Sequence, residues 1–397
     1  MILPTQEKER VVSIDIMRGF ALLGIFVVNM LFFHGPYIYV NPYTWYQNPQ
    51  DYEAFKWIDI FVQGSVYPLF AMLFGYGLAM QFTKSEKAGT SFAKLAVRRL
   101  LILLGIGCIH AFLIWSGDIL ITYAIAGLLL VLLMSLKPLW LFVIGAVLFL
   151  LPNSLLLGLV YLGGLIDPDA LTVYAGIQEV EASILAYSEG SWGEIIAQNF
   201  ADWWYMNQWG VNILTAITNI LPFLMIGAAA SKLKLIERAK ELKIFWIITV
   251  LVSFIVGTYI KWLPFTTEAN LLTSSFQDLF GGSLQAIAYG GFLALICSVP
   301  VVSKILSPIG KVGRMSMTIY LMQSIIATTI LYSYGFALYG RIDVGTGTWL
   351  AIGIYVLQVI FAEIWFTKFK QGPVEFLWRK LTYSNSLIKK DENNVKL

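Results

Sequence analysis

Imidazole chemistry in this 397-residue chain would have to use His34 or His110, because the sequence contains only 2 histidines. His110 comes near the end of one apolar stretch, and Asp118 follows at the predicted start of the next. A carboxylate that orients a histidine is an arrangement that general-base catalysis uses. His110 is therefore a candidate base and Asp118 its orienting partner. The alternatives are a buried histidine bonded across helices and a carboxylate that only caps a helix.

The link between these two residues predicts a tight hairpin. Ser116 and Gly117 favour a turn of about two residues between consecutive helices, on the outer face of the membrane. Such a turn would bring Asp118 back toward His110 near a water-facing rim. At that place Asp118 could also accept hydrogen bonds from the free N–H groups of the helix start.

Asp15 and Arg18 form a second candidate group, at the beginning of the first apolar stretch. Their spacing places both side chains on one face of a helix. Arginine is suited to binding phosphate, so the pair marks a place where a phosphate-bearing ligand could arrive. The alternative is a simple ion pair at the helix start. Asn29 and His34 lie further along the same predicted helix.

The stretches that carry these residues are long and apolar. The chain is 58% hydrophobic and 13% charged, and its mean hydropathy is +0.73. A soluble protein of this composition would expose too much apolar surface, whereas charge-free runs of about 20 residues suit a bilayer core. Each run must be helical, because a lipid-exposed strand would leave its backbone groups unpaired. The sequence predicts an all-α polytopic bundle of about ten transmembrane helices, at Val12–Phe33, Ile60–Phe82, Val97–Trp115, Ile119–Leu136, Leu139–Leu162, Val211–Ser231, Ile244–Leu263, Leu279–Val299, Met315–Tyr334 and Thr348–Lys368.

The basic residues predict how these helices are oriented. Of the 27 Lys and Arg residues, all except Lys56, Lys261 and Arg341 fall in segments on one side of the membrane. The positive-inside bias makes that side cytoplasmic, so both termini are expected there. We treat residues 1–397 as one integral-membrane domain with a cytoplasmic tail at about 369–397. The net charge of +3 fits anionic lipid and not nucleic acid.

The longest predicted outer segment spans about residues 166–209 and contains no Lys or Arg. Ser191 and Glu194 within it have the spacing of a capping box, which predicts a helix that begins there. The segment is interpreted either as a helix at the membrane interface or as a lid over an outward cavity.

Other chemistries lack support. Cys108 and Cys297 both lie within predicted spans, and no Cys/His cluster has metal-ligand spacing, so neither a disulfide framework nor a metal site is expected. Phosphate-loop, nucleophile-elbow and dinucleotide-binding motifs are absent from the sequence. Single amides in several spans favour hydrogen bonds between helices, although Gln323 is retained as a candidate for lining the site.

Six blocks of the sequence carry a resemblance to a known family: Val11–Ile25 followed by Asn29, Leu73–Gly77, Trp115–Leu120, Gly313–Tyr320, Gln323-Ser324 and the tail block Gly372–Tyr383. They resemble the YeiB-like family, bacterial multipass membrane proteins that carry a domain of unknown function. The resemblance covers essentially the whole chain and implies a bacterial plasma membrane as its location.

A more distant resemblance concerns the first helix. The Asp-x-x-Arg-Gly pattern at Asp15–Gly19 is similar to that of transmembrane acyltransferases of the family-3 type and of the heparan-glucosaminide N-acetyltransferase type. Where the family-3 type has its catalytic histidine, this chain has Asn29, as the glucosaminide type does. In the glucosaminide type the catalytic histidine lies further along the chain. His34 also lies beyond Asn29, but it is closer to Asn29 than that pattern requires. The resemblance implies a shared fold and an acyl-CoA donor whose acyl group reaches an acceptor on the far side.

The leading hypothesis is an acyltransferase-like membrane protein that uses a cytoplasmic acyl-CoA donor. Its acceptor would be a small-molecule or lipid-linked substrate at the outer face. In that scheme His110 and Asp118 are catalytic, and the substrate-binding residues are Asp15, Arg18, Asn29, His34 and Gln323. The competing hypotheses are a small-molecule transporter or exporter, in which the same polar residues form the path, and a non-catalytic scaffold. The bilayer is the expected partner, and a homo-oligomer is compatible with the sequence.

Overall fold

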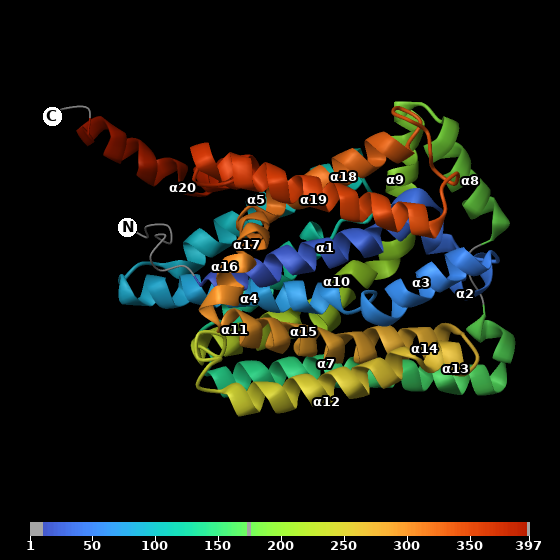
Figure 1. The fold of residues 1–397 in the computed structure, drawn as a ribbon, viewed down its shortest axis with the longest axis horizontal. Helices are drawn as coiled ribbons and strands as arrows, with labels where there is room; N and C mark the ends of the chain where they lie inside the picture. Colours follow the sequence, from blue (N-terminus) through green and yellow to red (C-terminus); the bar gives the residue numbers. More distant parts are fainter. Residues whose placement is uncertain (1–10, 173–175, 395–397) are drawn as a thin grey trace.

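The computed structural model describes residues 11–172 and 176–394, and its side-chain detail extends to residue 383. The described residues form helices and their links, with no strand among them. Figure 1 shows the long helices side by side, with the start of α1 and the helix α20 at the same end of the bundle. The predicted all-α polytopic architecture is confirmed.

The first half of the chain contains one central helix, several long helices and short turns at one end of the bundle. Its elements are α1 (Val12–His34), η2 (Tyr37–Tyr39), α2 (Pro42–Trp45), α3 (Pro49–Phe61), α4 (Val66–Lys87), α5 (Phe92–Leu113), α6 (Leu120–Leu133), α7 (Pro138–Ile166), η3 (Pro168–Leu171), α8 (Ile177–Glu189), α9 (Trp192–Asn207) and η4 (Gln208–Gly210).

The second half adds further spans, two of them with π-helical turns, and ends in an amphipathic helix. Its elements are α10 (Val211–Thr215), the π turn η5 (Ala216–Ile220), α11 (Leu221–Lys232), α12 (Lys243–Lys261), α13 (Leu263–Thr266), α14 (Leu271–Phe276), the π turn η6 (Gln277–Gly281), α15 (Gly282–Cys297), α16 (Pro300–Ile305), α17 (Ser307–Arg314), α18 (Ser316–Leu331), α19 (Val344–Lys368) and α20 (Pro373–Asn394).

The predicted spans all coincide with apolar helices. Among the described residues, 8 helical segments are long and apolar enough to cross a membrane. The other two predicted spans lie on the shorter apolar helices Leu120–Leu133 and Ser316–Leu331. The chain is therefore a polytopic helical membrane protein.

Two segments depart from their predicted bounds. The span predicted from Ile60 is interrupted, because α3 ends at Phe61 and α4 begins at Val66. Gly64 at this break has φ of 70°, and a Cβ added there would lie 2.8 Å from the backbone oxygen of Asp278. The span predicted from Leu279 begins earlier, since α14 and η6 place polar residues inside the helix. In the sequence, polar residues just before an apolar run indicate the start of a span, although here they lie inside the helix.

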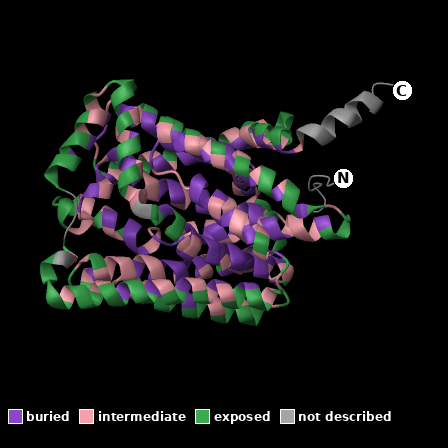
Figure 2. Cartoon of the chain, turned by 180° about the vertical axis from the view of Figure 1, so that it is seen from behind, coloured by how far each residue is buried: buried purple, intermediate pink, exposed green. Residues whose placement is uncertain are grey.

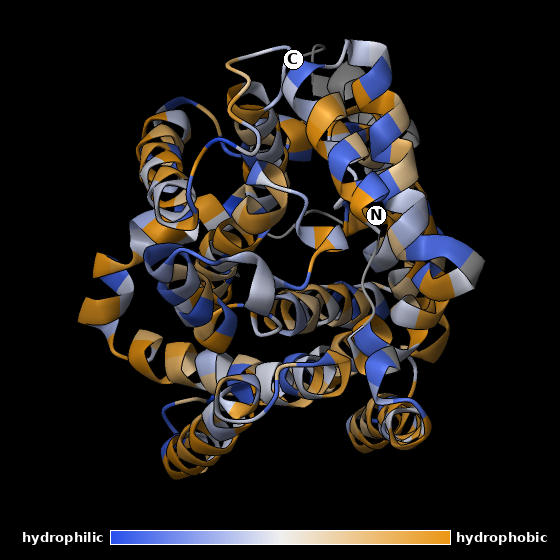
Figure 3. Cartoon of the chain, turned by 90° about the vertical axis from the view of Figure 1, so that its right-hand side faces the viewer, coloured by the Kyte–Doolittle hydropathy of each residue, from blue (hydrophilic) through white to orange (hydrophobic). Residues whose placement is uncertain are grey.

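Burial distinguishes the central helix from the lipid-facing ones. Helix α1 packs against α4, α15, α17, α18 and α19, and 67% of the residues in its most apolar stretch are buried. The corresponding values are 22% for α7 and 11% for α12, whose exposed residues include Leu151 and Ile255. Figure 2 shows these two helices along one edge with exposed residues, and Figure 3 shows largely hydrophobic colour on the helices at that edge. Their outward faces are suited to lipid.

Helices α8 and α9 lie at the opposite end of the bundle from α20 (Figure 1). The predicted capping box is present: Glu194 N–H donates to Ser191 Oγ, and Ser191 N–H donates to Glu194 Oε2 at 2.7 Å. The rings of Tyr187 and Tyr332 stack at 4.3 Å, and Tyr39 donates to buried Asp202 at 2.7 Å. These contacts hold α8 and α9 against the end of the bundle.

Candidate functional site

His110, Asp118 and Ser324 form a series of hydrogen bonds in the interior. His110 Nδ1 lies 2.8 Å from Asp118 Oδ1, and His110 Nε2 lies 2.9 Å from Ser324 Oγ. A carboxylate can only accept, so the Nδ1–H of His110 donates to Asp118. In the neutral ring Nε2 is then the acceptor, and the Ser324 hydroxyl donates to it. The structure thus brings together the two residues that the sequence paired, and adds a serine from α18.

The link between α5 and α6 explains how Asp118 reaches this position. It extends over residues 114–119, so it is longer than the predicted turn. Asp118 Oδ2 accepts from the backbone N–H of Ile121 at 2.9 Å, which fixes the carboxylate at the start of α6. A Cβ on Gly107 would lie 2.8 Å from that nitrogen. Glycine at this place therefore allows α5 and the start of α6 to approach closely.

His110 is enclosed between two aromatic rings. The ring of Tyr320 lies 5.1 Å from it on one side, and Trp115 lies 6.3 Å from it in an edge-on arrangement. His110 is 0% exposed and Ser324 is 1% exposed. The water-facing rim expected for His110 is therefore replaced by a buried position inside the bundle.

A cavity of about 340 Å³ reaches from the basic end of the bundle to Tyr320. On α1 it is lined from Val11 to Ile25, which is about 20 Å of helix. Its volume lies in the range of small-molecule sites. The lining is cationic at the end nearer the chain termini and aromatic or aliphatic further in. The charged lining residues are Asp15, Arg18, Lys84, Arg99, Arg314, Lys370, Glu375 and Arg379, and the inner lining includes Leu22, Ile25, Phe70, Phe74, Leu120, Tyr123 and Tyr320.

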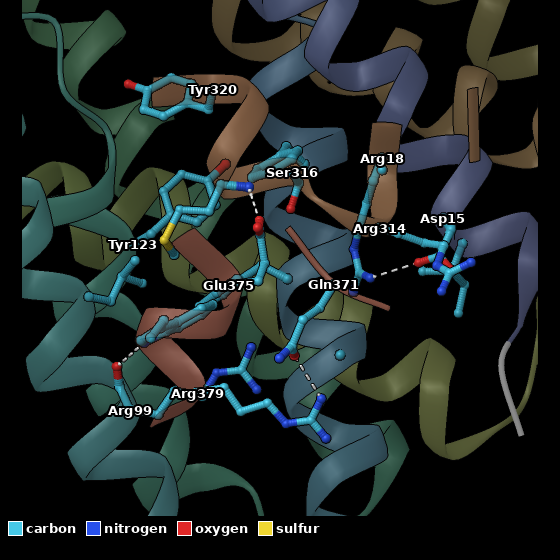
Figure 4. A pocket seen from close by; sticks show the side chains of 18 of the residues that line it. Asp15, Arg18, Arg99, Tyr123, Arg314, Ser316, Tyr320, Gln371, Glu375 and Arg379 are labelled. Carbon is cyan, nitrogen blue, oxygen red and sulfur yellow. Dashed lines mark hydrogen bonds and ion pairs between the residues drawn. The ribbon is translucent and has the colours of Figure 1, made fainter. Parts of the chain in front are cut away.

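Figure 4 shows this gradient directly. The labelled arginines Arg18, Arg99 and Arg379 occupy the lower and right-hand parts of the view, whereas Tyr320 lies at the upper end. An anionic group would be favoured among the arginines, and an apolar or thin uncharged group further in.

The predicted pair Asp15 and Arg18 lies at the wall of this cavity. Arg18 Nη1 is 3.3 Å from Asp15 Oδ1, and Arg18 also donates to the backbone oxygen of Leu73 at 3.3 Å. Two glycines make room for the pair. A Cβ on Gly77 would lie 2.9 Å from Arg18 Nη2, and one on Gly313 would lie 1.9 Å from the Asp15 backbone oxygen. The pair therefore holds α1 to its neighbours while it lines the cavity.

Helix α20 forms one wall of the basic end of the cavity. The Glu375 carboxylate accepts from the backbone N–H groups of Met317 at 2.7 Å and Thr318 at 3.1 Å, and so caps α18. Trp378 Nε1–H donates to the Arg99 backbone oxygen at 2.9 Å, and the Arg99 guanidinium lies 4.1 Å from the Trp378 ring centre. Burial raises the pKa of the Glu375 carboxyl, and its hydrogen bonds oppose that rise. The predicted tail is thus packed onto the bundle over its first turns.

A second, much smaller hollow lies on the Trp115 side of His110. Its volume is about 10 Å³, which is about the space of one water molecule. It is lined by Trp115, Ser116 and Gly117 and covered by residues of α8 and α9, including Tyr187 and Asp202. Burial raises the pKa of Asp202, which its three side-chain hydrogen bonds counteract. His110 therefore lies beside one ring that lines the large cavity, Tyr320, and one that lines this small hollow, Trp115.

The other sequence candidates lie apart from the cavity. Asn29 is on α1 one turn beyond Ile25 and is not among the lining residues. His34 ends α1, is 6% exposed, and its Nε2 has no hydrogen-bond partner within the described chain. Gln323 is 2% exposed and donates to Gln358 Oε1 at 3.1 Å. The structure therefore groups His110 with Asp118 and separately Asp15 with Arg18, but it does not bring the remaining three to either place.

Sequence reasoning missed Ser324, Tyr320 and the arginines at Arg99, Arg314 and Arg379. Ser324 is 214 residues from His110, so no local spacing could pair them. The arginines looked like ordinary membrane-interface residues. Arg314 and Arg379 fall within two of the blocks that carry the family resemblance, and all three arginines lie on the predicted cytoplasmic side, so these signals could have grouped them.

A second buried ionisable cluster lies near the opposite end of the bundle. Lys261 is 0% exposed, and its Nζ lies 2.9 Å from Asp278 Oδ1 and 4.0 Å from Asp59 Oδ1. Gln277 Nε2–H donates to Asp59 Oδ2 at 2.6 Å, and the Tyr43 hydroxyl donates to the same oxygen at 3.0 Å. Of the cavities described above, neither is lined by these residues. Across the described chain, no group of three His, Cys, Asp or Glu side chains could hold a metal ion.

Comparison with known proteins gives the family. Residues 230–385 match the family model described as "Protein of unknown function (DUF418)". The chain is 32% identical to the uncharacterized protein YxaH of Bacillus subtilis, over 96% of this chain and 96% of YxaH. It is 31% identical to the uncharacterized protein YeiB of Escherichia coli, over 94% of this chain and 96% of YeiB. No solved structure matches the chain. The protein therefore belongs to the DUF418 family of YeiB-like bacterial membrane proteins.

Proposed function

We propose that this protein is a membrane acyltransferase that takes an acyl group from a coenzyme A thioester. One observation carries the proposal: a cavity lined by arginines at one end reaches Tyr320, whose ring is 5.1 Å from that of His110. A ligand with an anionic head and a thin, weakly polar arm would fit such a cavity. An acyl-CoA has these properties, with phosphates at one end and a reactive thioester at the other.

The arginines would hold the phosphates of the donor. Arg18 and Arg99 come from α1 and α5, and Arg379 comes from α20, so the charges converge from three helices. Guanidinium groups form bidentate hydrogen bonds with phosphate oxygens. The arm would then run along the apolar lining past Phe74 and Tyr123 toward Tyr320.

His110 would act as the base at the inner end. Asp118 accepts from His110 Nδ1, which leaves Nε2 as the nitrogen that takes a proton. The carboxylate also stabilises the imidazolium that forms. Burial of the pair excludes water, which would otherwise hydrolyse the thioester.

The donor side would be the cytoplasm, with the acceptor approaching from the other face. The excess of Lys and Arg at the end that bears the cavity mouth supports this orientation. Cysteine labelling tests it with two exposed positions, Ala88 in the link after α4 and Ala182 on α8. In a background that lacks Cys108 and Cys297, Ala182→Cys should react with an impermeant reagent in intact cells, and Ala88→Cys only after permeabilisation. Reaction of Ala88→Cys in intact cells would reverse the orientation.

Donor binding is tested with coenzyme A and the purified full-length protein by calorimetry. Arg18→Ala should weaken binding roughly 10- to 100-fold, because a charged hydrogen bond contributes about 1.5–3 kcal/mol. Arg341→Ala is the matched control, since Arg341 is exposed and does not line the cavity. If coenzyme A binds both variants equally well, the arginines do not form the donor site.

Transfer itself is tested in vesicles that contain labelled acetyl-CoA inside and candidate acceptors outside. The label should leave coenzyme A and appear in a covalent product. A transporter, the second candidate, would move solute across the vesicle wall and give no covalent product. Folded protein that leaves the label on coenzyme A across a broad acceptor panel, while it carries solute, would establish transport instead.

A further inference from the structure

We propose that Ser324 carries the acyl group between donor and acceptor as an acyl-serine intermediate. The inference rests on the acyltransferase function proposed above and adds a covalent step to it. Its basis is the hydrogen-bonded series of Asp118, His110 and Ser324. An orienting carboxylate, an imidazole and a hydroxyl in this order form an activated nucleophile.

The hydrogen bond from Ser324 determines which hydroxyl His110 activates. His110 Nδ1 is 2.8 Å from Asp118, and Nε2 is 2.9 Å from Ser324 Oγ, so both ring nitrogens are engaged inside the protein. His110 is 0% exposed. An incoming acceptor therefore meets no free imidazole nitrogen, and the hydroxyl placed to lose its proton is that of Ser324.

The chemistry balances in two steps. In the first, Ser324 Oγ bonds to the thioester carbonyl carbon and its proton passes to His110 Nε2. The C–S bond then breaks, and the departing sulfur takes that proton, so coenzyme A leaves as a thiol. In the second step, a hydroxyl or amine of the acceptor attacks the acyl-serine and gives its proton to His110. The bond from the acyl carbon to Ser324 Oγ breaks, and the proton returns to that oxygen.

Tyr320 is placed to assist the first step. It lies one helical turn before Ser324 on α18, so both side chains share a helix face. Its ring lines the inner end of the cavity, and its buried hydroxyl finds no acceptor for its proton among the described residues. A hydroxyl donor at that place can stabilise the negative charge that develops on the carbonyl oxygen.

A covalent carrier also fits the two hollows. The Tyr320 ring lines the large cavity and Trp115 lines the small hollow, and both rings lie beside His110. Ser324 bonds to the same imidazole, so an acyl group on Ser324 would lie close to residues of both linings, although neither lining includes Ser324 itself. The acyl group could then be handed on while coenzyme A stays on the side from which it came.

The first half-reaction can be measured without knowing the acceptor. Purified full-length protein is mixed with acetyl-CoA labelled in the acetyl group, and no acceptor is added. The expected result is a burst of about one coenzyme A per protein, with the acetyl label on the peptide that contains Ser324. Labelled free coenzyme A should also exchange into unlabelled acetyl-CoA, since the first step is reversible.

Three variants assign the label. Ser324→Ala should abolish the burst, the adduct and the exchange. Ser324→Cys should form a thioester adduct that hydroxylamine removes more readily than the serine ester. Tyr320→Phe should slow the burst roughly 10²- to 10³-fold, because loss of one hydrogen-bond donor to the oxyanion has that effect in other enzymes. Thr328→Val is the matched control, because Thr328 is equally buried on α18 and its hydroxyl donates to the backbone oxygens of Ser324 and Ile325 and not to His110; its burst should equal that of the unsubstituted protein.

The outcomes separate this inference from the proposed function. If coenzyme A binds and label reaches an acceptor in the vesicle assay, but the unsubstituted protein gives no adduct and no exchange, Ser324 is not a carrier and transfer is direct. Transfer to an acceptor that survives in Ser324→Ala at the original rate would lead to the same conclusion. If coenzyme A does not bind at all, the acyltransferase proposal itself fails.

Discussion

The two buried ionisable clusters of this protein have similar chemistry and different surroundings. Each joins a nitrogen base to carboxylate: His110 to Asp118, and Lys261 to Asp278 and Asp59. His110 is next to a ring that lines a cavity of about 340 Å³, whereas the residues of the lysine cluster line neither that cavity nor the smaller hollow. A buried charge inside a membrane protein is usually functional. Of these two clusters, the histidine cluster lies beside a ring, that of Tyr320, that lines a cavity.

The hydrogen-bond surroundings of the two clusters indicate different roles. Around His110 one hydroxyl, that of Ser324, meets a nitrogen that can take up a proton. Around Lys261 the carboxylates are saturated by neighbours, since Gln277 and Tyr43 donate to Asp59 and Lys261 donates to Asp278. The lysine cluster thereby holds together α12, α3 and the π turn η6. We infer that the His110 cluster affects the rate of acyl transfer, whereas the Lys261 cluster affects the stability of the fold.

Among the ionisable groups of the two clusters, the largest expected effect on rate is that of His110→Ala. Loss of a general base costs on the order of 10²–10⁴ in rate. Acyl transfer from labelled acetyl-CoA should fall by that factor, while coenzyme A binding measured by calorimetry stays nearly unchanged, because His110 lies beyond the cavity lining. A parallel loss of transfer and binding would mean that His110 shapes the donor site instead.

Lys261→Met should strongly lower the stability of the fold and leave the rate of acyl transfer unchanged. Breaking a buried ion pair by removing one partner costs about 3–5 kcal/mol, and the lower end applies because Asp278 is partly exposed. Thermal unfolding in detergent should shift clearly downward, while the fraction that remains folded should transfer acyl groups at the original rate. A stable variant with a specific loss of rate would give the lysine cluster a role in the reaction.

The sequence predicted the fold well because its signals are local. Apolar runs give the spans, and the capping box at Ser191 gives the start of α9. His110 and Asp118 could be paired because they flank one link. Ser324 could not, since its contact with His110 depends on how α18 packs beside α5. The span predicted from Leu279 leaves out Gln277 and Asp278, although they belong to a π turn inside a longer helix.

Asp118→Asn should reduce the rate less than His110→Ala does. The amide oxygen of asparagine can still accept from His110 Nδ1, but it cannot stabilise an imidazolium as a carboxylate can. One asparagine orientation would also place an NH₂ group against the Ile121 N–H that Asp118 Oδ2 now accepts. The rate of the burst with acetyl-CoA provides the measurement. A loss equal to that of His110→Ala would mean that the negative charge, and not orientation alone, is essential.

The smallest expected effect is that of Gln323→Leu, a third kind of buried polar group. Gln323 bonds to Gln358 of α19, and Gln358 in turn donates to the backbone oxygen of Ile319 at 3.3 Å. Hydrogen bonds between membrane helices average about 0.6 kcal/mol, so the thermal midpoint should move only slightly. The burst with acetyl-CoA should be unaffected, because Gln323 bonds to Gln358 and not to His110, although it precedes Ser324 in the chain. A neighbouring buried side chain that does not contact the imidazole would then leave the rate intact, whereas loss of the Ser324 hydroxyl would not. A loss of rate in Gln323→Leu with the fold retained would return this amide to the substrate site and weaken the distinction that contact with His110 provides.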